Sequence, residues 1–214
     1  MDITYDNELL EETNSILSKM SSQERIMWAR QEFGDSIIMT TSGGETSAIL
    51  PHLVNSVLST RPPIIFVDTG YYSDATLKMI HYLRSQDYNV QIYTPELRRT
   101  EIEKRYPRWW TSDQFETVRT MIKHDPLNRA FSDHRPRIWL TGVMSYKTGK
   151  EPKMFDFNNG LYMLRPLLDW TEKKAMDYLS NHDLPLNQNH QDITKSSGDS
   201  CDCGIHNSCG LIAK

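Results

Sequence analysis

The sequence has no cysteine in its first 200 residues. Its three cysteines all lie within the last 14 of 214 residues, at 201, 203 and 209. A disulfide framework would spread its cysteines along the chain to join distant loops. We therefore interpret these thiols as reactive or metal-binding.

Long hydrophobic runs are also missing. The longest apolar runs are as short as Ile64–Val67, and a membrane-spanning helix needs about 20 such residues. Residues 1–6 are acidic and lack the basic and apolar blocks of a signal peptide. We therefore expect a cytoplasmic protein without a membrane partner, in a compartment where thiols stay reduced.

The chain has no excess of positive charge, because its formal net charge is -4. A protein that binds nucleic acid mainly by electrostatics needs a dominant basic patch. We therefore expect no nucleic-acid partner. The hydrophobic fraction of 38% is ordinary for a globular protein, and the length suits one domain.

Hydrophobic periodicity predicts strands that alternate with helices. The expected strands are 35–41, 64–69, 90–94, 137–143 and 162–166, and the expected helices are 46–59, 73–86 and 171–182, with 98–132 mostly helical. This alternation predicts an α/β fold with an open, mostly parallel sheet and helices on both faces.

We divide the chain into three parts. Residues 1–34 hold two amphipathic helices that pack on the domain, the second capped at Ser21 through Glu24. Residues 35–183 form a nucleotide-binding α/β domain. Residues 184–214 are polar and form a flexible tail that carries the cysteines.

A glycine-rich turn, Ser42–Ser47, follows the first expected strand. Gly43 and Gly44 let backbone N–H groups approach an anion, and the next helix presents the positive end of its dipole. The hydroxyls of Ser42, Thr46 and Ser47 add donors. These features favour a phosphate site over a plain strand-to-helix turn. No lysine stands where a Walker loop requires it.

This turn resembles the S-G-G-x-[DT]-S loop of the adenine-nucleotide alpha hydrolase-like superfamily, which includes ATP pyrophosphatases and sulfonucleotide reductases. Three further segments resemble the phosphoadenylyl sulfate (PAPS) reductases, in the order and spacing of that family. They are Asp68–Tyr71, Lys123–Ala130 and Leu164–Trp170. The last segment is expected to be structural, with Trp170 in the core.

The resemblance implies a set of substrate contacts. They are Ser42, Gly43, Gly44, Thr46, Ser47, Asp68, Thr69, Gly70, Lys123, Arg129, Gly142 and Lys147. The alternative interpretation makes Asp68–Gly70 a turn with a helix cap, and makes Lys123 and Arg129 charges on a solvated helix face.

The tail segment Asp202–His206 is similar to the E-C-G-[LI]-H motif of the same family, whose cysteine is the nucleophile. The resemblance implies that Cys203 attacks the sulfonate sulfur of PAPS. The S-sulfocysteine is then cleaved by reduced thioredoxin or glutaredoxin to release sulfite. His206 or nearby cations would stabilise the thiolate. The family also implies a homodimer and no tightly bound cofactor.

Other uses of the thiols remain open. Cys201, Cys203, His206 and Cys209 form a possible zinc set, although a C-x-C pair is tighter than the usual knuckle. Cys201 or Cys209 alternatively resolves an intermediate at Cys203 as a disulfide. An iron–sulfur cluster is disfavoured, because the positions around Met121 that would match its cysteine pair carry none.

The chain departs from the family after the fourth strand. Where the family has G-[LV]-R-R-x-[QD]-S, residues 142–149 contain no arginine. Lys147 or Lys150 would replace that pair, but an ammonium lacks the fork of a guanidinium. Two other functions therefore stay open: a PP-loop ATP pyrophosphatase-type adenylating enzyme, and a non-catalytic, zinc-stabilised nucleotide-binding protein.

Overall fold

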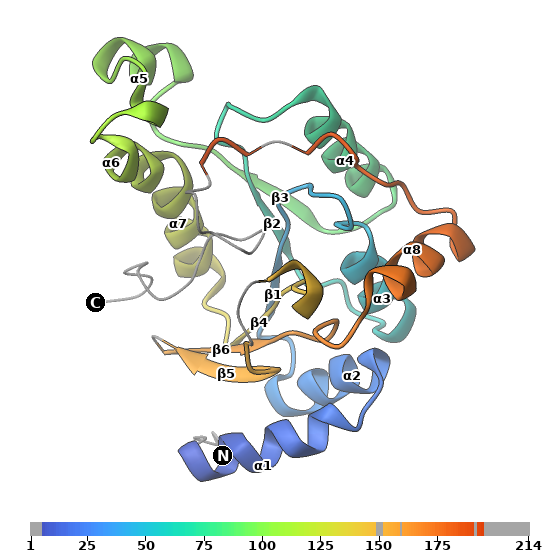
Figure 1. Ribbon diagram of the computed structural model, residues 1–214. Coiled ribbons are helices and arrows are strands. Elements are labelled where there is room, and N and C mark those ends of the chain that lie inside the picture. Colours follow the sequence, from blue (N-terminus) through green and yellow to red (C-terminus); the bar gives the residue numbers. More distant parts are fainter. Residues whose placement is uncertain (1–5, 149–151, 159, 191, 195–214) are drawn as a thin grey trace.

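The computed structural model describes residues 6–148, 152–158, 160–190 and 192–194 (Figure 1). Its centre is a six-stranded sheet with the order β3-β2-β1-β4-β6-β5. The strands are β1 (Ile37–Thr40), β2 (Ile64–Val67), β3 (Val90–Tyr93), β4 (Ile138–Leu140), β5 (Phe155–Asn158) and β6 (Leu161–Leu164). All neighbours are parallel except β5 and β6, which confirms the expected α/β class.

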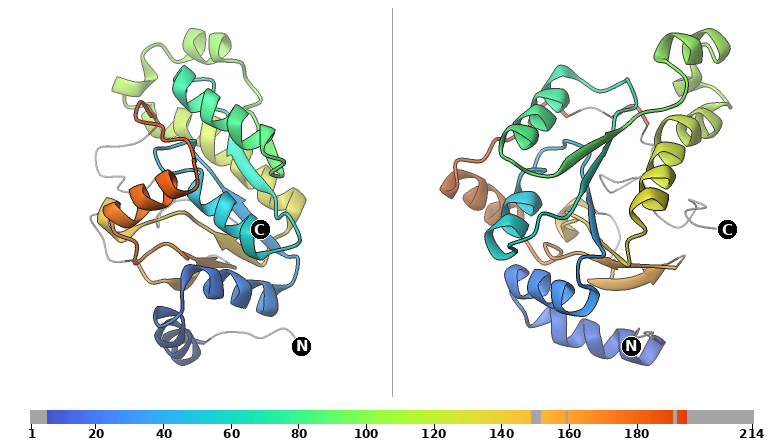
Figure 2. Two further views of the ribbon diagram at one scale, coloured as in Figure 1. Left: turned by 90° about the vertical axis from the view of Figure 1, so that its right-hand side faces the viewer. Right: turned by 180° about the vertical axis from the view of Figure 1, so that it is seen from behind.

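Helices lie on both faces of this sheet. They are α1 (Asn7–Ser18), α2 (Ser22–Phe33), α3 (Ile49–Val57), α4 (Asp74–Ser85), α5 (Arg99–Arg105), α6 (Phe115–Arg119), α7 (Asp125–His134) and α8 (Glu172–Asn181). The chain also has three short helical turns: η1 (Trp109–Thr111), η2 (Thr120–His124) and η3 (Ser145–Lys147). Figures 1 and 2 show α3, α4 and α8 on one side of the sheet and α7 on the other.

The central strands β1, β2 and β4 are apolar at every position except Thr40, because both of their faces are buried. In β1, Ile37 and Met39 pack in the larger core with α2, α3 and α4, whereas Ile38 packs in a second core with Phe131 of α7. Strand β4 repeats this alternation, since Trp139 faces the second core. Such strands are typical of a parallel sheet between two helical layers.

The N-terminal helices are anchored to the segment between β6 and α8. Ser21 and Glu24 form the expected capping box of α2. Arg25 of α2 is fully buried and donates to the carbonyl oxygens of Leu17 and Pro166. It also makes a bidentate pair with Asp169, at 2.7 and 2.8 Å. The guanidinium of Arg25 therefore joins α2 to the segment between β6 and α8, which lies far away in the sequence.

Two elements differ from the expectation. Strand β5 was not anticipated, and it pairs antiparallel with β6 at the edge of the sheet. The expected helical segment 98–132 is broken into α5, η1, α6, η2 and α7. Pro107 accounts for the first break, because it disfavours helix at the preceding residue and α5 ends at Arg105.

Trp170 is in the core as expected, 3% exposed, and its indole N–H donates to Ser22 Oγ at 2.7 Å. Thr171 caps α8 by accepting a hydrogen bond from the backbone N–H of Lys174. Within the described residues, every helix is too short or too polar to cross a membrane.

Candidate active site

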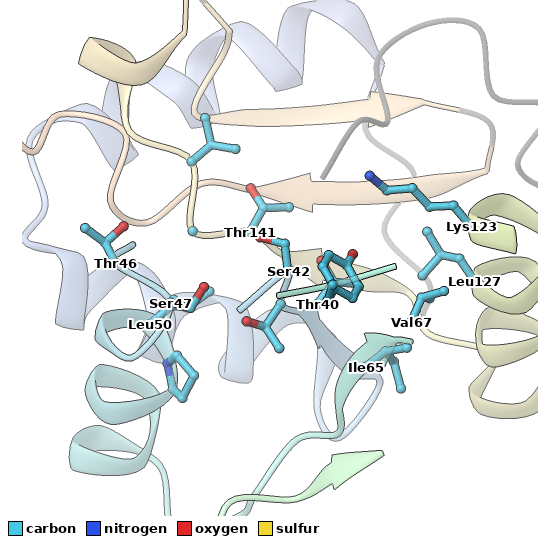
Figure 3. Close-up of a pocket in the computed structure, with 15 residues that line it drawn as sticks. Thr40, Ser42, Thr46, Ser47, Leu50, Ile65, Val67, Lys123, Leu127 and Thr141 are labelled. Atoms are coloured by element: carbon cyan, nitrogen blue, oxygen red, sulfur yellow. The ribbon is translucent and has the colours of Figure 1, made fainter. Parts of the chain in front are cut away.

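A pocket opens at the carboxyl ends of β1, β2 and β4 (Figure 3). Strand order reverses here, because β1 has β2 on one side and β4 on the other. In open α/β sheets this switch point is where ligands bind. The lining residues are Thr40, Thr41, Ser42, Thr46, Ser47, Leu50, Pro51, Ile65, Val67, Tyr72, Lys123, Leu127, Thr141, Gly142 and Val143.

The turn after β1 depends on glycine at position 43. Gly43 has φ +67°, in the left-handed region that side chains disfavour. A Cβ there would lie 2.8 Å from Thr76 Cγ2 of α4, so α4 could not pack where it does. The turn continues through residues 45–48, and regular helix α3 begins at Ile49, three residues later than the sequence predicts.

Two buried hydroxyls in this pocket have no hydrogen-bond partner among the described residues. They are Ser42 Oγ and Thr141 Oγ1, from the turn after β1 and the end of β4. Buried polar atoms are nearly always paired in folded proteins. Both residues line the pocket, so their hydroxyls are candidate contacts for a ligand bound there.

Lys123 lies on the opposite side of the pocket from Ser47 and Thr46 (Figure 3). Its side chain is only 7% exposed, so the interpretation as a solvated helix charge is wrong. Its Nζ donates to Asp192 Oδ2 at 2.8 Å and to Thr194 Oγ1 at 2.9 Å. Lys123 sits in η2, a π-helical turn of the kind that often marks a functional site.

The Asp192 carboxylate is buried with this lysine. Burial opposes its ionisation, but the charge of Lys123 and the hydrogen bonds from Lys123 and Thr194 outweigh that effect. They hold the pKa of Asp192 below its ordinary value. The Asp192 carboxylate is therefore ionised at neutral pH.

Lys147, which follows β4, lies beside the glycine turn without being among the lining residues. Its Nζ donates to Glu45 Oε2 at 2.8 Å and approaches Thr46 Oγ1 at 3.3 Å. Gly142 lines the pocket directly. The segment without arginines thus brings one cation to the turn.

Seven residues of the expected set are not among the lining residues: Gly43, Gly44, Lys147, Asp68, Thr69, Gly70 and Arg129. Asp68 accepts from the backbone N–H of Gly70 at 3.0 Å, and Thr69 accepts from that of Tyr71 at 3.3 Å. The pocket is reached by their neighbours Val67 and Tyr72 instead.

Arg129 also lies away from this pocket. It binds the carbonyl oxygen of Thr94 and lies 3.6 Å from Glu96, beside a second hollow that Arg105 also lines.

The tail residues Cys201, Cys203, His206 and Cys209 lie outside the described residues. Their roles as nucleophile, stabilising base, resolving thiol or zinc ligand stay predictions. Within the described ranges, no group of three or more histidine, cysteine, aspartate or glutamate side chains is placed to hold a metal ion.

Asn187 was missed by sequence reasoning and contacts the glycine turn directly. It is 6% exposed, its side-chain amide donates to the Gly43 carbonyl at 2.7 Å, and its backbone N–H donates to the Glu45 carbonyl at 3.3 Å. These bonds fix the carbonyl side of the turn, in which the Gly43 N–H donates to Thr41 Oγ1 at 3.1 Å and the Ser47 N–H donates to the Gly44 carbonyl at 3.2 Å. Asn187 gave no sequence signal, because it stands in a polar stretch with other asparagines.

Replacing Asn187 with Ala should lower the free energy of unfolding by about 1–2 kcal/mol, the cost of leaving a buried carbonyl unpaired. Anionic nucleotides should also bind more weakly, because the turn loses its support. Urea unfolding and calorimetric titration measure the two effects. Asn189→Ala is the matched control, since Asn189 is exposed and contributes backbone bonds. Equal binding by Asn187→Ala and wild type would contradict this role.

The fold and the pocket together define an open α/β protein with a pocket at the switch point of the sheet, beside a glycine-rich turn. Residues 36–202 match the model of the phosphoadenosine phosphosulfate reductase domain. The chain is 32% identical to a phosphoadenosine 5'-phosphosulfate reductase of Synechococcus sp., over 82% of this chain and 78% of that protein. A relative of the same name from Photobacterium profundum is 29% identical, over 89% and 77%.

The chain therefore belongs to the PAPS reductase family, and it is an oxidoreductase of that family. The fold agrees with a crystal structure of phosphoadenylyl-sulfate (PAPS) reductase from Candida auris, with a TM-score of 0.77 at 21% identity, over 88% of this chain and 92% of that one. A flavin mononucleotide adenylyltransferase from Candida glabrata shares the fold more distantly, with a TM-score of 0.55 at 15% identity, over 87% and 62%.

Proposed function

We propose that this protein reduces PAPS to sulfite and adenosine 3',5'-bisphosphate, with Cys203 as the nucleophile and reduced thioredoxin or glutaredoxin as the electron donor. The relatives that match most of the chain carry the name of this activity. The single observation that carries the proposal in the structure is the pocket over Ser42–Ser47. There, two buried hydroxyls lack partners and a buried lysine faces the turn.

The described residues would hold the phosphosulfate group. The hydroxyls of Ser42 and Thr141 would donate to its oxygens, and Lys123 would supply positive charge. Backbone N–H groups of the glycine turn would add donors, apart from those of Gly43 and Ser47, which already donate to Thr41 Oγ1 and to the Gly44 carbonyl. The apolar side chains of Ile65, Val67 and Leu127, which line the same pocket, exclude water around the nucleoside. A dry site strengthens each of these electrostatic contacts.

The thiolate of Cys203 would attack the sulfonate sulfur, so that an S–S bond forms as the S–O bond to the phosphate breaks. The electron pair of that bond leaves on adenosine 3',5'-bisphosphate, whose new charge is stabilised by the turn and by Lys123. A thioredoxin thiolate then attacks Cys203 Sγ and expels sulfite. The second thioredoxin thiol reduces the mixed disulfide and restores Cys203.

Ligand preference tests this proposal in the pocket itself. Calorimetric titration of the full chain should show tighter binding of adenosine 3',5'-bisphosphate than of AMP or ATP, because the bisphosphate is the product. Tighter binding of ATP, with pyrophosphate release that survives Cys203→Ser, would instead favour an adenylating enzyme. Since Lys147 is the cation that the segment after β4 places at the turn, Lys147→Met should weaken bisphosphate binding more than AMP binding.

A further inference from the structure

In the described part of the chain, one lysine lies beside the glycine turn and another across the pocket from it, and each already has a carboxylate partner. Lys147 pairs with Glu45 near the surface, with side chains 22% and 43% exposed. Lys123 pairs with Asp192 in the interior, with side chains 7% and 1% exposed. A substrate rich in negative charge thus meets cations whose charge is neutralised before it arrives.

The two pairs differ in strength. Glu45 is half in solvent, where an ion pair contributes little. Asp192 is enclosed, and it is held by Thr194, whose backbone N–H donates to Oδ1 at 2.9 Å. Buried charges interact strongly, and a buried lysine that loses its partner needs another anion. Of the two ion pairs, the one between Asp192 and Lys123 is therefore the harder for a ligand to break.

Asp192 also has the chemistry of the group expected in the pocket. One carboxylate oxygen accepts from Lys123 Nζ at 2.8 Å, as one oxygen of a sulfate or phosphate would. The same chain segment is fixed over the turn by Asn187, and over α4 by His190, whose Nδ1 lies 3.1 Å from Thr76 Oγ1. The carboxylate thus comes from the segment that contacts the glycine turn through Asn187, and it reaches the pocket through Lys123, which lines it.

We propose that Asp192 is an internal counter-ion that competes with the ligand's oxyanion for Lys123, and so sets how much negative charge a ligand must bring. The inference rests on the proposed function, in that the ligand is an anionic adenine nucleotide. A neutral nucleoside gains nothing from Lys123. A nucleotide with two phosphate groups, or with one phosphate and one phosphosulfate group, has enough negative charge to replace Asp192 as the ion-pair partner of Lys123.

The test compares adenosine, AMP and adenosine 3',5'-bisphosphate by calorimetric titration of the wild type and Asp192→Asn. Asparagine keeps the shape of the side chain and removes its charge. The bisphosphate should bind roughly tenfold more tightly to the variant, because binding no longer requires the charged hydrogen bond between Lys123 and Asp192 to break. A hydrogen bond to a charged group contributes a free energy of about this size. The affinity for adenosine should stay the same. A charge-dependent gain of this kind is not expected from a purely structural role.

Two further variants sharpen the result. In a Lys123→Met background, Asp192→Asn should give no gain, because the competition needs the ammonium. Thr194→Val removes the uncharged hydroxyl that accepts from Lys123 and donates to Asp192, and it leaves the charge of Asp192 in place. It should not produce the tenfold gain. If the wild type binds the bisphosphate and Asp192→Asn binds it equally or more weakly, Asp192 is a positioning partner of Lys123 and the inference is wrong.

Two measurements separate this failure from failure of the proposed function. If neither protein binds adenine nucleotides, the proposed function fails, and titration with inorganic sulfate decides the inference: tighter binding by Asp192→Asn supports it, and equal or weaker binding overturns it. If the variant does not fold, hydrogen exchange of wild-type residues 192–194 replaces it. Bound bisphosphate should accelerate exchange at Thr194, and unchanged or slower exchange would overturn the inference.

Discussion

Replacing Cys203 with Ser is expected to abolish sulfite release from PAPS, with a loss of at least about 1000-fold. A hydroxyl is a far weaker nucleophile than a thiolate near neutral pH, and removal of a covalent nucleophile leaves mainly the contribution of substrate binding. The assay is sulfite production by the full chain with reduced thioredoxin. Binding of adenosine 3',5'-bisphosphate should be retained, because the proposed nucleotide contacts are made by the described residues that line the pocket.

Cys209→Ser is the matched comparison for this variant. A single turnover without reductant needs only the attacking thiol. If Cys203 is that thiol, the Cys209→Ser variant should still consume PAPS under these conditions. Equal sulfite release by Cys203→Ser and wild type would remove Cys203 from the mechanism. Stoichiometric zinc in the purified protein, lost together in Cys203→Ser and Cys209→Ser, would favour the zinc-stabilised alternative.

Replacing Arg25 with Met should lower the free energy of unfolding by about 3 kcal/mol, the low end for breaking a buried ion pair, because Asp169 is half-exposed and can be rehydrated. The loss arises mainly at the carbonyls of Leu17 and Pro166, which Arg25 satisfies inside the protein. Urea unfolding measures it. Since Arg25 joins α2 to the segment before α8, we expect the transition to remain a single one at a lower midpoint.

Lys173→Met provides the control, because Lys173 pairs with Asp177 on the exposed face of α8 and such pairs contribute little. A loss below about 1 kcal/mol for Arg25→Met would contradict the anchoring role.

The effect of Arg25→Met on the free energy of unfolding should also depend on pH. Burial opposes ionisation of Asp169, but the hydrogen bonds and charge of Arg25 outweigh it and hold the pKa of Asp169 below its ordinary value. This stabilisation is present above the ordinary aspartate pKa of about 4 and is lost as pH falls through the folded-state pKa. The difference between variant and wild type should therefore narrow in acid.

The sheet and its covering helices could be predicted because each central strand is a short apolar run bounded by polar turns. β1, β2 and β4 are buried on both faces, and their sequences show it. Strand β5 was missed for the opposite reason. It lies at the sheet edge, and only Phe155 of its four residues is buried, so its pattern is close to that of a loop.

The glycine turn was predictable because its chemistry is local: Gly43 needs a left-handed φ, and the hydroxyls stand beside it. The contacts that complete the pocket depend on the fold. Asn187 meets Gly43 from 144 residues away, and Asp192 meets Lys123 from 69 residues away. Thr141 looks like any residue at the end of a strand until β4 is placed beside β1. No spacing rule connects such positions before the sheet order is known.

The most direct test of the central claim is mass spectrometry of the full chain after incubation with PAPS and no reductant. The account predicts a sulfonate adduct on Cys203, which disappears when reduced thioredoxin is added and sulfite is released. Absence of that adduct, with the thiols shown to be free and adenosine 3',5'-bisphosphate shown to bind, would contradict it.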